Sequence, residues 1–233
     1  MAPESLVVSF PAAGVGDSMA GWLTGPAAEC SGAGYLPLPN PGCLEELISD
    51  DWRRRTLSQI QHAVTEAAVD RVILVGHCLG GLSALYLVDE VRSRCAVPTA
   101  LVVVNTPCPD GEGRVPSLAG STDQEIGEVL AADGFPTEVL EDEDMLAEVA
   151  DRVRDGARLG DWISRRLHAA GAPPALTVLS TRRDAFIGVE HCAAWRNRVL
   201  GEFNLTIVDG RHTLDDASMG VLARLLDSAI SSP

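Results

Sequence analysis

Cys78 lies in the segment of the sequence with the clearest chemical signal, residues 72–81 (VILVGHCLGG). A short apolar strand there runs into a turn that has glycine two positions before and two positions after the cysteine, at Gly76 and Gly80. Such a turn holds a nucleophile in a strained backbone conformation at the tip of a strand, and its neighbours are small because strand and helix approach closely. The segment therefore predicts a nucleophile elbow with a thiolate as the attacking group. The alternative is a small buried core residue, the ordinary place of a free cysteine.

A helix is predicted directly after the elbow, because apolar residues recur there at helical spacing. Its dipole would favour a thiolate at Cys78, which faces the helix N-terminus. The residues that carry this spacing are Leu82, Leu85, Val88 and Val91.

Two later residues could complete the chemistry, because a thiol needs a histidine base and the histidine needs a carboxylate to orient it. Asp184 follows a predicted strand at 176–180, and His212 follows another at 203–208. The order nucleophile, acid, base is that of the α/β-hydrolase arrangement. The alternatives are that Asp184 is a solvated loop or cap residue and that His212 is a surface histidine. Asp209 is a rival acid, but it precedes His212 too closely to approach the imidazole easily from behind.

Three further residues near these positions receive other roles. His77 is adjacent to the nucleophile, but neighbouring side chains on an elbow point in different directions, so we expect it to pack behind the site and not to act as the base. Asp215 and Asp216 are expected to cap the last helix, where a carboxylate at the N-terminus is favourable.

An oxyanion hole requires two backbone N–H donors. One is expected from the residue after the nucleophile, Leu79, and the other from the loop after the first strand, at Ala13. The turn 14–16 (GVG) belongs to the same loop, and a simple chain reversal is the alternative use of its glycines.

The elements that must position these residues alternate between strands and helices, which is typical of an α/β fold with a mostly parallel sheet and helices on both faces. About seventy residues separate two of the strands, with helical spacing inside, so an inserted helical lid is expected at about 108–172. The expected strands are 6–10, 35–38, 72–75, 99–104, 176–180 and 203–208, with helices carrying Leu57, Ile60 and Val64 before the elbow and Val221, Leu222 and Leu225 at the end.

Composition narrows the function. The 233 residues fit one α/β domain, 1–233. A formal charge of −15, with arginine as the only basic residue, argues against nucleic acid as a partner and rules out a Schiff-base lysine. The six scattered cysteines lack zinc-ligand spacing and a disulfide pattern. Neither a secretion signal nor a membrane-spanning run is evident. We expect a cytoplasmic protein with no bound cofactor or metal.

Four segments resemble motifs of one known family, the type II thioesterases that stand beside modular polyketide and nonribosomal peptide synthases, within the α/β hydrolases. Residues 10–14 (FPAAG) are similar to the family's Phe-Pro-His-Ala-Gly oxyanion segment. Residues 76–81 (GHCLGG) resemble its Gly-His-Ser-Met-Gly-Ala elbow, 133–136 (DGFP) its cap motif Gly-Gly-x-Pro, and 210–212 (GRH) its Gly-Gly-His. The position of Asp184 fits the family's acid.

The resemblance implies removal of acyl groups from the phosphopantetheine arm of an acyl or peptidyl carrier protein, in antibiotic-type biosynthesis. Three departures stand out: Cys78 replaces serine, Ala12 replaces the usual histidine or aromatic residue, and 39–42 (PNPG) differs from the family's Tyr-Pro-Gly-Arg loop. Because attack by a thiolate on a thioester gives another thioester of similar energy, transfer between carriers stays open beside hydrolysis. A few relatives with this substitution shuttle aminoacyl groups.

Other interpretations also stay open. A cysteine-dependent lactone or ester hydrolase would act on small free substrates, and a non-catalytic module would only bind a carrier. The oligomeric state is not fixed by the sequence, and a monomer is the expectation. Arginines of the lid could dock an acidic carrier helix or the phosphate of the arm, or form a solvated surface of mixed charge. They are Arg152, Arg154, Arg158, Arg165 and Arg166, with Arg182 and Arg183 beside Asp184.

Overall fold

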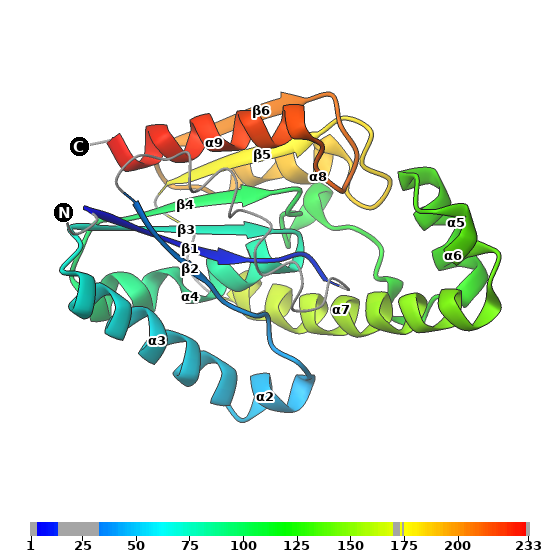
Figure 1. Cartoon of the computed structure of the whole chain (residues 1–233), viewed down its shortest axis with the longest axis horizontal. Coiled ribbons are helices and arrows are strands. Elements are labelled where there is room, and N and C mark those ends of the chain that lie inside the picture. The colour runs from blue at the N-terminus through cyan, green and yellow to red at the C-terminus, as the bar shows by residue number, and fades with distance from the viewer. Residues whose placement is uncertain (1–3, 14–32, 170–172, 174, 232–233) are drawn as a thin grey trace.

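A six-stranded sheet forms the centre of the molecule (Figure 1). The computed structural model describes residues 4–13, 33–169, 173 and 175–231. The strands lie in the order β2-β1-β3-β4-β5-β6, and each neighbouring pair is parallel. Their bounds are Ser5–Phe10 (β1), Ala33–Pro37 (β2), Arg71–His77 (β3), Thr99–Val104 (β4), Leu176–Thr181 (β5) and Phe203–Val208 (β6).

The helices connect these strands and pack on both sides of them. The longer ones are α3 (Asp51–Ala67), α4 (Leu79–Cys95), α5 (Asp123–Asp133), α7 (Glu143–Ala169) and α9 (Asp216–Ser231), and the short ones are α2 (Leu44–Ile48), α6 (Thr137–Leu140) and α8 (Val189–Ala193). The described residues also form the 3₁₀ segments η2 (Gly111–Gly113), η3 (Leu118–Gly120) and η4 (Ala194–Asn197). The predicted parallel sheet with helices on both faces is confirmed.

Alternation along the strands divides the core in two. Val7 and Ile73 point to the face covered by α9, where they meet Leu222. Phe10 and Leu74 point to the opposite face and belong to the larger cluster with α3 and α4. Because both faces of the sheet are buried, the strand sequences are continuous apolar runs and do not alternate between apolar and polar residues.

The connection between β4 and β5 holds α5, α6 and α7, which we call the lid (Asp123–Ala169). Its first part has a small core of its own around Ile126, Leu130 and Ala150. The second half of α7 packs on the main body instead, since Ile163 and Leu167 belong to the larger core. The range 108–172 expected for the lid therefore includes a segment that also supports α4.

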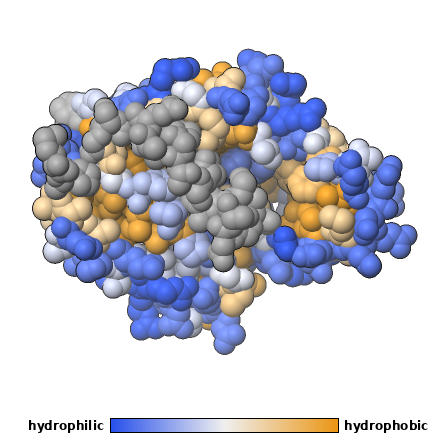
Figure 2. All heavy atoms as spheres, viewed as in Figure 1, coloured by the Kyte–Doolittle hydropathy of each residue, from blue (hydrophilic) through white to orange (hydrophobic). Residues whose placement is uncertain are grey.

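The carboxyl ends of all six strands point toward the lid, and the start of β1 and the end of α9 lie on the opposite side of the molecule (Figure 1). Figure 2 shows apolar side chains gathered on the lid where it faces the main body, with hydrophilic residues around the outer edge. Among the described residues, no helix has the length and apolar character needed to cross a membrane. The turn 14–16 and Cys30 lie outside the described residues.

Candidate active site

Cys78 lies between β3 and α4 with φ 55° and ψ −114°, a strained conformation for a residue with a side chain. Two glycines make the turn possible. A Cβ built on Gly76 would be 2.1 Å from the carbonyl oxygen of Gly80, and one on Gly80 would be 2.2 Å from that of Phe10. No larger residue fits at either position, so the elbow predicted from the sequence has the expected backbone.

His212 and Asp184 are brought together by the loops that follow β6 and β5. His212 Nδ1 lies 2.8 Å from Asp184 Oδ2, and because a carboxylate only accepts, Nδ1 carries the proton. The other carboxylate oxygen, Oδ1, accepts from the N–H groups of Phe186 and Ile187, each at 2.8 Å. The Asp184 side chain is fully buried. These bonds fix both the carboxylate and the plane of the imidazole.

The His212 side chain also interacts with that of Cys78, the nucleophile candidate on the elbow. Burial alone would lower the pKa of His212, but the Cys78 sulfur and the Asp184 carboxylate outweigh burial and raise this pKa to about 10. A raised histidine pKa favours the imidazolium form of His212. The structure thus brings all three predicted residues, Cys78, His212 and Asp184, into one chain of contacts.

His77 packs against the back of this arrangement. Its ring lies 4.7 Å from the ring of His212, centroid to centroid. Burial, followed by the positive charge of His212, holds the pKa of His77 well below its ordinary value. His77 is therefore a neutral surface on which the imidazole of His212 rests.

The remaining acidic candidates are used elsewhere. Asp209 forms an exposed ion pair with Arg183, at 2.8 Å. Asp215 Oδ1 accepts from the N–H of Ser218 at 2.8 Å and so caps α9, as predicted, and Asp216 is the first residue of that helix. None of these three residues forms a hydrogen bond with the imidazole among the described residues.

The two proposed oxyanion donors both border the cavity above Cys78. Leu79 is the first residue of α4, where an N–H has no carbonyl partner within the helix. Ala13 follows β1, and its segment is tied down by Asn40, which donates to the carbonyl of Pro11 at 2.7 Å. Asn40 in turn accepts from the hydroxyl of Ser83 at 2.9 Å. Asn40 was not predicted from the sequence. The available signal was that its loop, 39–42, differs from the corresponding motif of the family.

Asn105 was also missed. It lies at the end of β4, fully buried, with φ 43°. Its amide donates to the Thr181 hydroxyl at 2.9 Å and to the carbonyl of His212 at 3.4 Å, and its Oδ1 accepts from the Thr181 N–H at 2.9 Å. This residue joins β4, β5 and the loop of the histidine. The available signal for Asn105 was a polar residue directly after an apolar strand, in the run 101–105.

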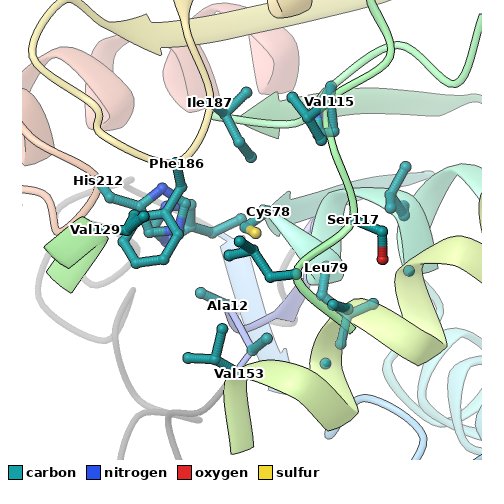
Figure 3. Close-up of a pocket in the computed structure, with 18 of the residues that line it drawn as sticks. Ala12, Cys78, Leu79, Val115, Ser117, Val129, Val153, Phe186, Ile187 and His212 are labelled. Atoms are coloured by element: carbon teal, nitrogen blue, oxygen red, sulfur yellow. The ribbon is translucent and has the colours of Figure 1, made fainter. Parts of the chain in front are cut away.

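A cavity of about 950 Å³ opens over Cys78, between the strand ends and the lid. Figure 3 shows the sulfur at its centre, with His212 and Phe186 on one side and Leu79 and Ser117 on the other. Much of the wall is apolar, which suits an acyl chain. Val115, Val129, Val153, Phe186, Ile187 and Leu214 are part of it.

The arginines of the lid are mostly engaged with their neighbours. Arg154 pairs with Asp123 at 2.8 Å, Arg158 pairs with Asp155 at 2.6 Å, and Arg152 pairs with Glu148. Arg166 lies over the Trp162 ring. This pattern fits the surface of mixed charge. In the part of the chain that the structure describes, no cluster of histidine, cysteine or acidic side chains could hold a metal ion.

Solved structures with this fold come from several thioesterases. RedJ, a thioesterase from the prodiginine biosynthetic pathway in Streptomyces coelicolor, is 22% identical, with a TM-score of 0.68 over 97% of this chain and 86% of that one. BorB, the type II thioesterase of the borrelidin cluster, is 19% identical, with a TM-score of 0.63 over 95% and 92%. Human thioesterase 2 is 13% identical, with a TM-score of 0.60 over 97% and 96%.

These likenesses show that the fold is that of the α/β-hydrolase thioesterases, as predicted. No curated protein sequence matches the chain. The family model of the thioesterase domain matches residues 57–224, more than half of the chain, and this match includes Cys78, Asp184 and His212. The chain therefore belongs to the thioesterase domain family.

Proposed function

We propose that this chain is a type II thioesterase that cleaves acyl or aminoacyl thioesters from the phosphopantetheine arm of a carrier protein, through an acyl-Cys78 intermediate. The observation that carries the proposal is the contact of Cys78, on its strained elbow, with the hydrogen-bonded pair of His212 and Asp184. Nucleophile, base and orienting acid in this geometry are the parts of an acyl-transfer site.

Acylation of the enzyme forms one carbon–sulfur bond and breaks another. The Cys78 thiolate attacks the thioester carbonyl, and the oxyanion that forms accepts hydrogen bonds from the N–H groups of Leu79 and Ala13. When the carbon–sulfur bond of the arm breaks, the imidazolium of His212 gives its proton to the departing thiolate. The products are acyl-Cys78, a free phosphopantetheine thiol and a neutral imidazole.

Hydrolysis needs this neutral imidazole. Once Cys78 is acylated its negative charge is gone, and with it the main cause that raised the pKa of His212. His212 can then take a proton from water while the oxygen attacks the acyl carbon. Breaking the bond to sulfur releases the carboxylic acid and restores the thiolate and imidazolium. Asp184 keeps the ring aimed in both half-reactions.

The size and lining of the cavity support an acyl substrate, because 950 Å³ holds a chain of many carbon atoms. BorB comes from the borrelidin cluster, and YbtT is a type II thioesterase from the yersiniabactin pathway of combined nonribosomal peptide and polyketide type. These two relatives in fold favour a similar role here, with a carrier protein as the partner.

Transfer to a second thiol is the other candidate reaction, and the sulfur of Cys78 favours it. An acyl-Cys78 thioester has nearly the energy of the carrier thioester, so a second carrier thiol can take the acyl group back. His212 would accept the proton of that thiol as it accepts one from water. The two reactions share every residue and differ in the acceptor.

The experiment uses a carrier protein loaded with a labelled acyl group, mixed with the enzyme alone or with an empty second carrier. Hydrolysis predicts labelled free acid in both mixtures, and transfer predicts label on the second carrier. Folded Cys78→Ala protein is the control and should give neither product. If the first carrier loses its label no faster than with the control protein, both reactions are contradicted. That result would favour a module that only binds the carrier.

A further inference from the structure

Asp133, the last residue of α5 in the lid, has a buried carboxylate with 7% of the residue exposed. Its Oδ1 accepts a hydrogen bond of 2.8 Å from the backbone N–H of His212. The same oxygen accepts a longer one, 3.4 Å, from the N–H of Ala185. One carboxylate of the lid thus binds the loop of the proposed base and the loop of its orienting acid.

The position of the Asp133 carboxylate is unfavourable for the stability of the fold. The C-terminus of a helix carries partial negative charge, so an acidic side chain in the last turn is repelled by the dipole. Burial adds a further cost unless the charge is hydrogen-bonded. Gly134, with φ 83°, ends α5 immediately afterwards, which leaves Asp133 at the unfavourable end. The hydrogen bonds to the two loops offset these costs.

A second contact joins the same two segments. The side chain of Arg211 donates to the backbone carbonyl of Asp133 at 3.2 Å. Gly134 leaves the space for it, because a Cβ there would be 1.4 Å from the Arg211 guanidinium. Consecutive residues of the loop, Arg211 and His212, therefore both bind the end of α5, and Figure 1 shows that end beside the loops that follow β5 and β6.

We propose that Asp133 is a positioning residue: its carboxylate fixes the backbone of His212 and so keeps the imidazole between Asp184 and Cys78. The inference rests on the proposed role of His212 as the base. It adds a dependence of that role on the lid, because the acceptor that fixes His212 is carried by α5. The lid then holds the base in place in addition to shaping the cavity.

Two substitutions separate the acceptor from the rest of the side chain. Asp133→Asn keeps a carbonyl oxygen for the two N–H donors, and its amide group can point into the cavity that Asp133 borders. Asp133→Ala leaves both donors without an acceptor. We expect kcat to fall about 10- to 100-fold in the alanine variant, with KM within about twofold, because a small misplacement of a reacting group costs up to about 100-fold. The asparagine variant should keep kcat within about threefold.

Thr122→Ala is the matched control, because Thr122 caps the other end of α5 and does not touch the loops of the site. Loss of a cap destabilises a helix. A general weakening of α5 would therefore lower kcat in this variant as much as in Asp133→Ala. If Asp133 acts through His212, the Thr122→Ala enzyme should keep its kcat within about threefold at 20 °C.

The rate of Cys78 alkylation by iodoacetamide, followed from pH 5.5 to 9.5, reports whether His212 still stabilises the thiolate. The titratable groups around the imidazole are Cys78 and His77 from the elbow and Asp184 from the loop after β5. Asp133 from α5 contacts the backbone N–H of His212. Asp133→Ala should slow alkylation at pH 6.5 toward the rate of His212→Ala, about tenfold below wild type. Asp133→Asn and Thr122→Ala should follow the wild-type profile.

The outcomes distinguish the proposed role of His212 as the base from the proposed role of Asp133 in positioning it. Identical profiles for wild type and His212→Ala would overturn the proposed pair of Cys78 and His212. If His212→Ala changes the alkylation profile but Asp133→Ala keeps the wild-type profile and kcat, only the positioning role of Asp133 is overturned. Failure of Asp133→Asn to restore kcat and the profile would also overturn it, since the charge and not the acceptor would then be what matters. A lower kcat in Asp133→Ala together with a wild-type kcat in Asp133→Asn supports the positioning role.

Discussion

Gly156 of the lid helix α7 lies against Ala13, which follows the end of β1 by three residues and which we propose as an oxyanion donor. A Cβ built on Gly156 would be only 2.4 Å from the Cβ of Ala13. Gly156 is buried in the middle of a 27-residue helix, where glycine costs about 1 kcal/mol relative to alanine. The close approach explains why glycine stands there, and it joins the lid to the segment that completes the site.

Gly156→Ala is therefore expected to push Ala13 away from Cys78 and to lower kcat at least tenfold, although alanine is the better helix former. Gly160→Ala, about one turn later, is the matched control, because its Cβ would make ordinary contacts of 3.6 and 3.8 Å with Leu82 and Leu79. Steady-state kinetics and thermal unfolding of both variants check this. Equal activity in the two variants would show that the Ala13 contact is irrelevant to catalysis.

His212 and Asp184 should act as a unit. We expect His212→Ala and Asp184→Asn each to lower kcat by about three to four orders of magnitude, because the ring loses either its function or its orientation. The double variant should be little slower than the slower single variant. Asp209→Asn is the control and should change kcat less than twofold, since Asp209 only forms an exposed ion pair. Losses that multiply in the double variant would indicate separate roles.

Stability should depend on pH through His212. Its pKa is raised from 6.5 to about 10 in the folded protein, so the stabilisation of the protonated ring is fully present below about pH 6.5. It is lost as the pH rises through 10. In urea unfolding, the advantage of wild type over His212→Gln should shrink between pH 7 and pH 10, with a slope of at most about 1.4 kcal/mol per pH unit. An advantage that grows with pH would contradict the raised pKa.

Cys78→Ser tests the use of sulfur. Serine should form an oxygen ester that a carrier thiol cannot easily recapture, so water becomes the productive acceptor with His212 as the base. The ratio of acyl transfer to free acid should fall at least tenfold relative to wild type in the assay with two carriers. A ratio that is the same in both proteins would mean that the acceptor is chosen by the cavity and not by the nucleophile.

Much of the fold could be predicted because its signals are local. Apolar runs such as 72–75 and 99–104 gave the buried strands, and the glycines around Cys78 gave the elbow. Asp184 and His212 could be placed together because the carboxyl ends of parallel strands meet at one edge of a sheet. For His77 the sequence predicted packing, and the structure adds its neighbour, the ring of His212.

The contacts that tie the lid to the site could not be predicted, because they join residues far apart in the chain. Asp133 binds the N–H of His212 across 79 positions, and Gly156 meets Ala13 across most of the chain. Periodicity shows that α5 and α7 are helices, but it does not show which loop lies against their ends. Asp133 occupies a position where the resembling cap motif has glycine, and Arg211 occupies one where the Gly-Gly-His motif has glycine. These two departures were the visible traces.

The most direct test of the central claim is the intact mass of the protein after rapid mixing with an acyl-loaded carrier. Wild type should gain the mass of one acyl group, and peptide mapping should place that group on Cys78. Asp184→Asn should accumulate the same adduct more slowly, and folded Cys78→Ala should gain none. Free acid or transferred acyl group produced at the wild-type rate by Cys78→Ala, or an adduct on another residue, would contradict the assignment of Cys78 as the nucleophile.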